Sequence, residues 1–421
     1  MSANRKIGIG IIGAGRRGIF CLGSRIAEST KETGFEVRAV CDVNPTRMNE
    51  AAGYLTRKFS ESGISLKISQ HSQYQNLIDD PAVELIMVTT PSYAHRDPTI
   101  LALRSGKKVY LDKPIAQNIE DSIAIMEEEM QTGNSLIMGF TRRYETPWRK
   151  AFSHVQQGVI GDLHMIQIRA IIPYDVYGHT WRRRRKWSGG ALNDKASHHF
   201  DAINWFAQSS AKHISAIGGQ AVYKPDPTAP ERCSECSREC NYRMEAKPSR
   251  NLTQQYQDVL PMEGDSWSQE TQEIYRIDNC VYLPGSDIKD HAIVQVAYDN
   301  GVVASLFWSI FGPHADDQET LELVGSNGRI ILKRHTAELD IVSHYGEFHE
   351  VINYKDDAFE TSHFGADLKL IRDMRSFFDG ESPIVSAQHG FESTRMVMAT
   401  HQSIDNVGQT VLMKDIPSTN R

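Results

Sequence analysis

The sequence of 421 residues lacks three features that would each assign it to a class of protein. No stretch approaches the roughly 20 apolar residues that a membrane-spanning helix needs, and the apolar run in "MSANRKIGIGIIGAG" is too short and too broken by glycine for a signal peptide. The formal net charge of −7 creates no positive field that would attract nucleic acid or an anionic membrane. We therefore expect a cytoplasmic protein with neither nucleic acid nor membrane as its partner.

Cysteine is also scarce. Six cysteines in 421 residues are too few for a disulfide scaffold, yet three of them fall within "CSECSREC", Cys233 to Cys240. The one basic run, "RRRRK" at Arg182 to Lys186, is local, and a solvated face or a loop of a substrate domain explains it better than contact with nucleic acid. The length and the 40% of hydrophobic residues allow two or three domains with a sizeable core.

The first informative stretch is "KIGIGIIGAGRRG", in which a short buried strand runs into a glycine-rich turn before a helix. Gly13 permits the tight turn, Gly15 lets the backbone approach a pyrophosphate, and Gly18 lets the helix pack closely on the strand. The helix N-terminus adds a positive dipole for the phosphates. This pattern predicts a dinucleotide site formed by the turn residues Gly13, Gly15, Arg16, Arg17 and Gly18.

A second strand, "FEVRAVCD", ends on Asp42, where a ribose-binding acid is expected. A carboxylate there accepts hydrogen bonds from the ribose hydroxyls and repels a 2′-phosphate. The sequence therefore predicts NAD rather than NADP as the cofactor.

Strands and helices alternate as far as about residue 140, which predicts a parallel sheet with right-handed crossovers. The expected strands include "VELIMVTTP", "KKVYLDKP" and "NSLIMGF", and the expected helices are "HRDPTILALRSG", ending at Gly106, and "NIEDSIAIMEEEMQTG", ending at Gly133. We assign residues 1–140 to a Rossmann NAD-binding domain, so that the fold class is α/β.

The pattern changes after Phe140. Long strands and the hairpin signal Asn300-Gly301 predict a largely antiparallel open sheet, with a second hairpin in "LELVGSNGRIILKR" and helices at about 192–208, 365–378 and 390–401. We assign residues 141–421 to an α+β domain for substrate binding and oligomerisation. An open sheet face needs a cover, so we expect a homodimer or homotetramer.

Two segments carry the candidate chemistry. Lys113 stands at the end of a strand in "YLDKPIA", where ligands of open α/β sheets bind. In "LNDKASHHFDAINWF", helical geometry places Asp194 and His198 about 40° apart on one face and His199 about 140° from Asp194. A carboxylate beside a histidine fixes its tautomer and stabilises the imidazolium of a general base.

Together these residues resemble the Gfo/Idh/MocA family of sugar and cyclitol dehydrogenases. The resemblance rests on the glycine turn, Asp42, "TTPSYAH" (89–95), "LDKP", "GFTRRY" (139–144) and Asp194-x-x-x-His198 followed by Asp201, and it covers both domains. It implies His198 as acid/base, Lys113 on the reacting hydroxyl, and Asp194 as the third member of the catalytic set. Implied cofactor contacts are Thr90, Pro91, His95, Asp112 and Lys113, and expected substrate contacts are Arg142, Tyr144, Lys195 and His199.

Two departures stand out. Asp112 replaces the family's commoner glutamate, and Lys195 and Ala196 stand where many members carry an apolar residue and glycine. Lys195 adds a cation beside the catalytic face, so the familiar inositol or glucose substrate does not follow from the resemblance.

The resemblance implies reversible oxidation of a secondary hydroxyl of a sugar, glycoside or cyclitol to a ketone. Two alternatives stay open. One is a redox-assisted glycosidase or lyase with tightly bound NAD, and the other is a non-catalytic dinucleotide-binding regulator, which the presence of Lys113, Asp194 and His198 disfavours.

Residues 224–282 read as an insertion that is polar, rich in proline and too poor in apolar residues to order itself. Cys233, Cys236, Cys240 and Cys280 could close it as a Cys₄ structural zinc site. Unligated thiols, and an iron–sulfur or redox role, remain the alternatives.

Overall fold

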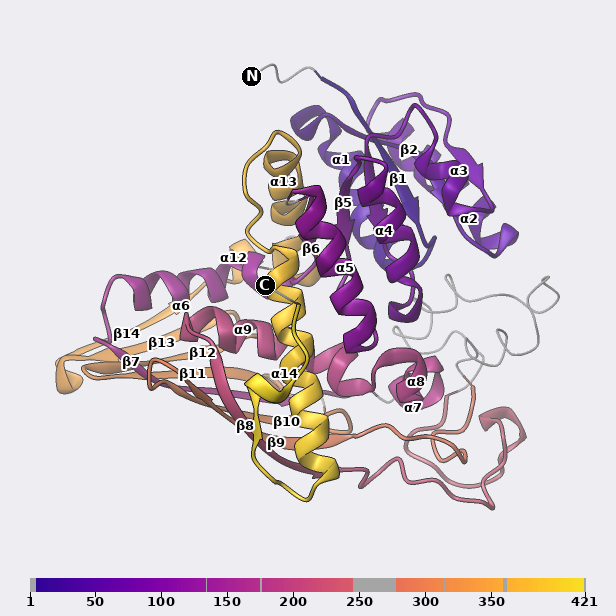
Figure 1. Ribbon diagram of the computed structural model, residues 1–421. Coiled ribbons are helices and arrows are strands. Elements are labelled where there is room, and N and C mark those ends of the chain that lie inside the picture. Colours follow the sequence, from indigo (N-terminus) through magenta and orange to yellow (C-terminus); the bar gives the residue numbers. More distant parts are fainter. Residues whose placement is uncertain are drawn as a thin grey trace.

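The computed structural model describes residues 5–133, 135–174, 176–244, 278–313, 315–358 and 362–419, which form two sheets with helices around them (Figure 1). Residues 245–277, the middle of the expected insertion, lie outside the described residues. No helix in the described part of the chain is long and apolar enough to span a bilayer.

The amino-terminal part contains a six-stranded parallel sheet in the order β3-β2-β1-β4-β5-β6, which confirms the predicted Rossmann fold. Its strands are β1 Ile7–Ile12, β2 Phe35–Cys41, β3 Ser69–His71, β4 Leu85–Val88, β5 Lys108–Leu111 and β6 Leu136–Met138. The intervening helices and turns are η1 Arg17–Gly23, α1 Ser24–Thr33, α2 Pro45–Glu61, α3 Tyr74–Ile78, η2 Ser92–Ala94, α4 Arg96–Arg104 and α5 Ile119–Thr132.

Local signals in the sequence fix the ends of α5. The side chain of Asn118 caps its first turn by accepting a hydrogen bond from Asp121 N at 2.7 Å. Gly133 ends it with φ of +76°, a left-handed conformation that glycine adopts readily.

The second sheet has nine strands in the order β14-β13-β12-β11-β7-β10-β9-β8-β15. Among its described strands only the β7–β10 pair is parallel, so the expected largely antiparallel sheet is confirmed. Its strands are β7 Leu163–Ile171, β8 Ala211–Gly219, β9 His291–Tyr298, β10 Val303–Ser309, β11 Glu319–Gly325, β12 Gly328–Lys333, β13 Glu338–Ser343, β14 Phe348–Asn353 and β15 Val411–Leu412. The Asn300-Gly301 hairpin joins β9 to β10, and Gly301 has φ of +88°.

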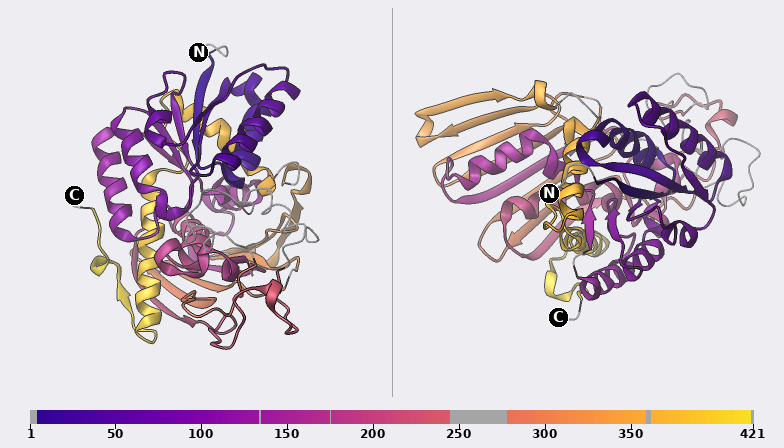
Figure 2. Two further views of the ribbon diagram at one scale, coloured as in Figure 1. Left: turned by 90° about the vertical axis from the view of Figure 1, so that its right-hand side faces the viewer. Right: turned by 90° about the horizontal axis from the view of Figure 1, so that it is seen from above.

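Helices α6, α9 and α14 lie on the face of this sheet that is turned toward the Rossmann domain (Figures 1 and 2). The helices and short turns of this part are η3 Thr141–Tyr144, α6 Thr146–Gln156, α7 Val176–His179, η4 Trp181–Arg183, α8 Arg185–Ser188, η5 Leu192–Ala196, α9 Ser197–Ala207, η6 Cys233–Glu235, η7 His344–Gly346, α12 Lys355–Ala358, η8 Ser362–Gly365, α13 Ala366–Phe378, α14 Ala387–Asp405 and η9 Met413–Asp415. The opposite face of the sheet exposes apolar side chains, among them Met165, Ile217 and Ile293.

The chain returns to the Rossmann domain near its end. Helix α13 packs with Leu370, Ile371 and Met374 in the same hydrophobic core as the first sheet, and Met138 N donates to Val385 O at 2.9 Å. The two structural units therefore do not divide the chain at one point near residue 140, because part of the carboxyl-terminal segment completes the Rossmann core.

Candidate active site

The glycine turn after β1 is packed tightly against the end of β4. Gly13 has φ of +93°, and a Cβ there would lie 2.7 Å from Thr90 N. A Cβ on Gly18 would lie 2.3 Å from Thr89 Oγ1, so neither position tolerates a side chain. Gly15 and Arg16 lie in the same turn, ahead of the π-helical turn η1, and Gly15 O accepts the Ile19 N–H at 3.0 Å. The bare backbone at this turn fits the pyrophosphate of a dinucleotide.

Asp42 follows β2 and lies beside this turn. Its carboxylate accepts hydrogen bonds from Ala14 N at 2.8 Å and Asn44 N at 2.9 Å, while Arg47 Nη1 lies 3.7 Å from Oδ2. The acid is thus held at the turn where the ribose of a dinucleotide would lie.

Arg17 plays a different part from the phosphate contact that the sequence suggests. Its partly buried guanidinium donates to Asp367 Oδ1 at 2.5 Å and to Tyr110 OH at 3.3 Å, and it lies 3.4 Å from Asp112 Oδ1. The Arg17 side chain therefore ties the glycine turn to α13 and β5, and any contact with a cofactor would come from its backbone. Asp112 also accepts from Tyr110 OH at 3.0 Å, so this acid belongs to the same cluster.

His95 joins the loops that follow β4 and β5. Its Nε2 lies 2.9 Å from Thr90 O and its Nδ1 lies 2.9 Å from Pro114 O, with Pro91 in the same first loop. Because both ring nitrogens face backbone carbonyls, His95 holds these two loops together.

Lys113 reaches from the end of β5 across to the second domain. Its Nζ donates to the backbone oxygen of Asp194 and lies 3.6 Å from Asp194 Oδ1; the peptide bond that links Lys113 to Pro114 is cis. The structure thus brings together the strand-end lysine and the aspartate that sequence reasoning placed in one site.

The carboxylate of Asp194 binds the surrounding basic side chains and does not bind His198. Its Oδ2 accepts from Arg182 Nε at 2.9 Å, and Tyr177 donates a further hydrogen bond. Although burial opposes ionisation, Lys113 and Arg182 hold the pKa of this carboxyl well below its usual range. The expected Asp194–His198 pairing is corrected: the segment 192–196 forms a π-helical turn before α9, so the 100° step per residue of an α-helix does not apply there.

His198 lies close by with a free ring nitrogen. Its Nδ1 is buried and has no hydrogen-bond partner among the described residues. Burial and the positive charges of Lys113, Arg142 and Lys195 lower its pKa well below the ordinary value, so the ring is neutral at pH 7. A neutral imidazole can accept a proton from a bound hydroxyl.

Arg142 and Tyr144 bind acidic side chains of the protein, whereas the sequence predicts that they contact the substrate. Arg142 Nε and Nη2 donate to Glu319 at 2.9 and 3.0 Å, and its Nη1 donates to Glu145 at 3.0 Å. Tyr144 OH donates to Asp373 Oδ2 at 2.6 Å and thereby fixes η3 to α13. Both side chains are thus engaged by carboxylates of the protein itself.

His199 points into the buried network of ionic side chains around Glu319 and not at Asp194. Its Nε2 lies 3.3 Å from Glu319 Oε1, and burial lowers its pKa. The network consists of Arg142, Glu145, Glu319 and Arg334, and His199 borders it.

Among the described residues, the Lys195 amine has one hydrogen-bond partner. Its Nζ lies 3.1 Å from Tyr174 OH and 4.4 Å from the centre of that ring. The ammonium group lowers the pKa of the Tyr174 hydroxyl, which makes this phenol a stronger hydrogen-bond donor.

Sequence reasoning did not identify Tyr174, Tyr177 and Arg182 as members of the site. Arg182 was visible only as part of the basic run, and the two tyrosines fall in or beside short turns with no periodic pattern. No local signal distinguishes them from surface residues.

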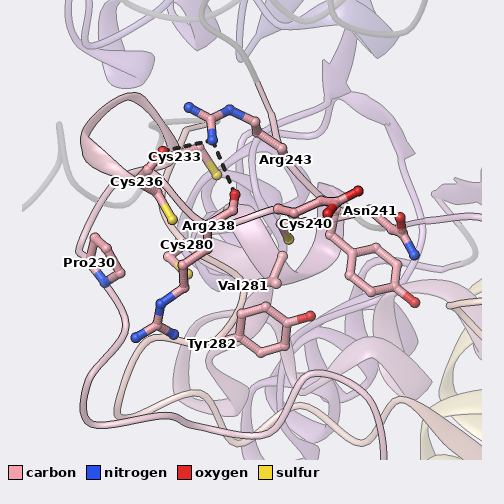
Figure 3. A pocket seen from close by; sticks show the side chains of 12 residues that line it. Pro230, Cys233, Cys236, Arg238, Cys240, Asn241, Arg243, Cys280, Val281 and Tyr282 are labelled. Atoms are coloured by element: carbon pink, nitrogen blue, oxygen red, sulfur yellow. Dashed lines mark hydrogen bonds between the residues drawn. The ribbon is translucent and has the colours of Figure 1, made fainter.

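The four cysteines of the insertion line one cavity (Figure 3). An isolated bridge between Arg232 and Asn279 brings Cys233 beside Cys280, with Cys233 N donating to Asp278 O at 2.7 Å and Cys280 N to Glu231 O at 2.9 Å. All four thiols are free of disulfides, and no three of their sulfur atoms lie within 4.8 Å of one another. Cys21 and Cys41 are buried in the Rossmann domain, as small apolar residues would be.

A dinucleotide-type glycine turn, a strand-end lysine and a neutral buried histidine define a pyridine-nucleotide oxidoreductase. The chain belongs to the Gfo/Idh/MocA family: residues 7–140 match "Oxidoreductase family, NAD-binding Rossmann fold", and residues 153–411 match "Oxidoreductase family, C-terminal alpha/beta domain". These matches confirm the resemblance read from the sequence.

Individual relatives are distant. The putative oxidoreductase YteT of Bacillus subtilis is 25% identical over 71% of this chain and 70% of its own length. The myo-inositol 2-dehydrogenase of Thermotoga maritima is 26% identical over 51% of this chain and 59% of its own length. The chain therefore aligns with little more than half of that inositol dehydrogenase.

Among solved structures, a levoglucosan dehydrogenase in complex with NADH and levoglucosan superimposes with a TM-score of 0.73 at 17% identity, covering 98% of this chain and 100% of that chain. At this identity the likeness shows the shared fold.

Proposed function

We propose that this protein is an NAD-dependent dehydrogenase that reversibly oxidises a secondary hydroxyl of a sugar, glycoside or cyclitol to a ketone. The observation that supports it most is the juxtaposition of Lys113 with Asp194, beside a neutral His198 whose buried Nδ1 lacks a partner. The inositol 2-dehydrogenases and the levoglucosan dehydrogenase among its relatives point to the same class of substrate.

The glycine turn and Asp42 would hold NAD, which supplies the hydride acceptor when it is bound. His198 would take the hydroxyl proton, because its ring is neutral and lies beside Lys113. Lys113 would stabilise the negative charge that develops on the substrate oxygen. Asp194 acts through Lys113 and Arg182 and is therefore a positioning residue.

The test is NAD reduction by the purified protein over monosaccharides, glycosides, uronates and cyclitols. On the substrate found, Lys113→Ala and His198→Ala should each lower kcat by about 10²-fold or more, with NAD affinity retained. The exposed Lys150→Ala and His164→Ala serve as matched controls. Wild-type turnover in either site variant would contradict the assignment. Substrate cleavage without net NADH release would favour the lyase alternative, and NAD binding without any turnover would favour a regulator.

We also propose that Cys233, Cys236, Cys240 and Cys280 bind a structural zinc ion. Four thiols around one cavity supply the donor set of a closed tetrahedral site, and the side chains would have to rotate to bring the sulfurs to ligand distance. Such thiols stay unpaired in a reducing compartment, which is consistent with the cytoplasmic location that the sequence suggests. One equivalent of zinc in the purified protein, lost in Cys233→Ser, supports the site, and a metal-free protein with normal stability refutes it.

We further propose a homo-oligomer that buries the open face of the second sheet, where Ile217, Met165 and Ile293 expose 73%, 53% and 50% of their surfaces. Light scattering after size exclusion should give a dimer or a tetramer, and Ile217→Glu with Ile293→Glu should shift it toward the monomer. A monomeric wild type would exclude this proposal.

A further inference from the structure

Within the described part of the chain, Lys195 is a cation without a carboxylate partner at the centre of the site. It follows Asp194 directly on η5, its side chain is partly buried, and the only polar contact of its Nζ among the described residues is Tyr174 OH. In that part of the chain no carboxylate oxygen lies within 4.0 Å of this amine.

The nearby acids are already neutralised by other bases. Asp194 is shared by Lys113 and Arg182, while Glu319 and Glu145 are shared by Arg142 and Arg334. Three carboxylates therefore face five basic side chains, namely Lys113, Arg142, Arg182, Lys195 and Arg334. The site carries a surplus of positive charge.

A partly buried ammonium group without a counter-charge is unfavourable, and burial accordingly lowers the pKa of Lys195. An anionic group on a ligand would offset this cost. Tyr174 strengthens such a site, because its OH accepts from Lys195 and can donate its own proton to the ligand.

Lys195 is also close enough to the reacting groups for one small molecule to reach both. Besides burial, the positive charges of Lys113 and Lys195 both lower the pKa of His198. Lys195 and His198 also lie within one turn of the same helical segment. A hydroxy acid of sugar size can place a hydroxyl at His198 and a carboxylate at Lys195.

We propose that the substrate is a sugar acid, such as a uronate or an aldonate, whose carboxylate binds Lys195 and Tyr174 while its reacting hydroxyl lies at His198 and Lys113. The inference rests on the proposed dehydrogenase function and names its substrate class.

The test compares acids with neutral partners of the same stereochemistry: glucuronate with glucose, galacturonate with galactose, and each uronate with its methyl ester. Wild-type protein should oxidise one acid with a kcat/KM at least about 100-fold above that of its ester, because a carboxylate forms a charge-assisted hydrogen bond and the ester does not. Lys195→Met should lower kcat/KM for the acid by about 100-fold, mainly through KM, and lower it far less for the ester. Lys150→Met is the control for removal of a lysine charge, and circular dichroism verifies that each variant is folded.

Three results would overturn the inference. Equal kcat/KM for acid and ester would show that the carboxylate is not recognised, although NADH formation would leave the dehydrogenase function intact. An equal loss on both substrates in Lys195→Met would assign Lys195 and Tyr174 to proton transfer instead. Failure of every compound to reduce NAD would refute the proposed function itself, and the inference with it.

Discussion

The buried network between η3 and β11 allows a quantitative prediction about stability. Glu319 accepts from Arg142 at 2.9 and 3.0 Å and from Arg334 at 3.3 Å, and each of these side chains is at least nine-tenths buried. Glu319→Gln keeps the size of the side chain but removes its charge. Arg142 and Arg334 are then left with Glu145 as their shared carboxylate.

The cost follows from desolvation. Removing one partner of a buried ion pair leaves an uncompensated charge, which typically destabilises a protein by about 3–5 kcal/mol. The exposed pair between Arg372 and Glu32, each half exposed, provides the matched comparison. Surface pairs contribute about 0–1 kcal/mol, so Glu32→Gln should have little effect. The double variant Glu319→Gln with Arg334→Met restores charge balance and should be more stable than Glu319→Gln alone.

Urea unfolding followed by circular dichroism measures these differences. With an m value of about 3 kcal/mol/M, a loss of 3 kcal/mol lowers the midpoint by about 1 M. Although burial opposes ionisation, Arg142 and Arg334 hold the pKa of Glu319 well below its usual range. A carboxyl with a depressed folded pKa stabilises the protein above its unfolded pKa of about 4.3, and this contribution is lost as the pH falls further. Glu319→Gln should therefore lose less stability than wild type between pH 5 and pH 3. Midpoints for Glu319→Gln and Glu32→Gln within 0.3 M of each other would refute the reasoning.

Three further predictions concern the site and the cysteines. Asp194→Asn should lower kcat by about 10²-fold while the NAD affinity is retained, because it releases Lys113, and wild-type kcat would exclude a positioning role. Because the pKa of His198 is lowered by burial and by Lys113, the acid limb of kcat/KM should lie below the ordinary histidine pKa of about 6.5, and Lys195→Met should move it upward. A wild-type limb at or above that ordinary value would contradict this. Cys280→Ser should lower the thermal midpoint of the second domain and leave NAD affinity unchanged, and loss of NAD binding would show that the insertion serves the cofactor site.

Much of the fold could be predicted because its signals are local. The glycine turn, the cap of α5 at Asn118 and the Asn300-Gly301 hairpin each depend on a few consecutive residues. The return of α13 to the Rossmann core could not be predicted. Its amphipathic pattern shows only that one face is buried, not which sheet covers it.

Site membership could be predicted better than the partners within the site. Lys113, Asp194 and His198 were placed together by their positions at a strand end and on a helix, and in the structure they lie together. The partner of the Asp194 carboxylate was predicted on an ideal α-helix, whereas the π-helical turn directs it to Arg182 and Lys113. A sequence does not show such a turn, because one extra residue in it leaves the hydrophobic pattern of the following helix unchanged.

The partners of the basic residues near the site could not be predicted from the sequence either. Arg17 and Arg142 looked available for phosphate or substrate, yet each is neutralised by acids from distant segments, Asp367 and Glu319. Lys195 looked like an unexplained departure from the family pattern, and the structure leaves it without such an acid among the described residues. Whether a basic side chain binds a ligand or the protein depends on the charges that tertiary structure brings to it. A buried base that no acid neutralises is therefore the more informative position for identifying a substrate.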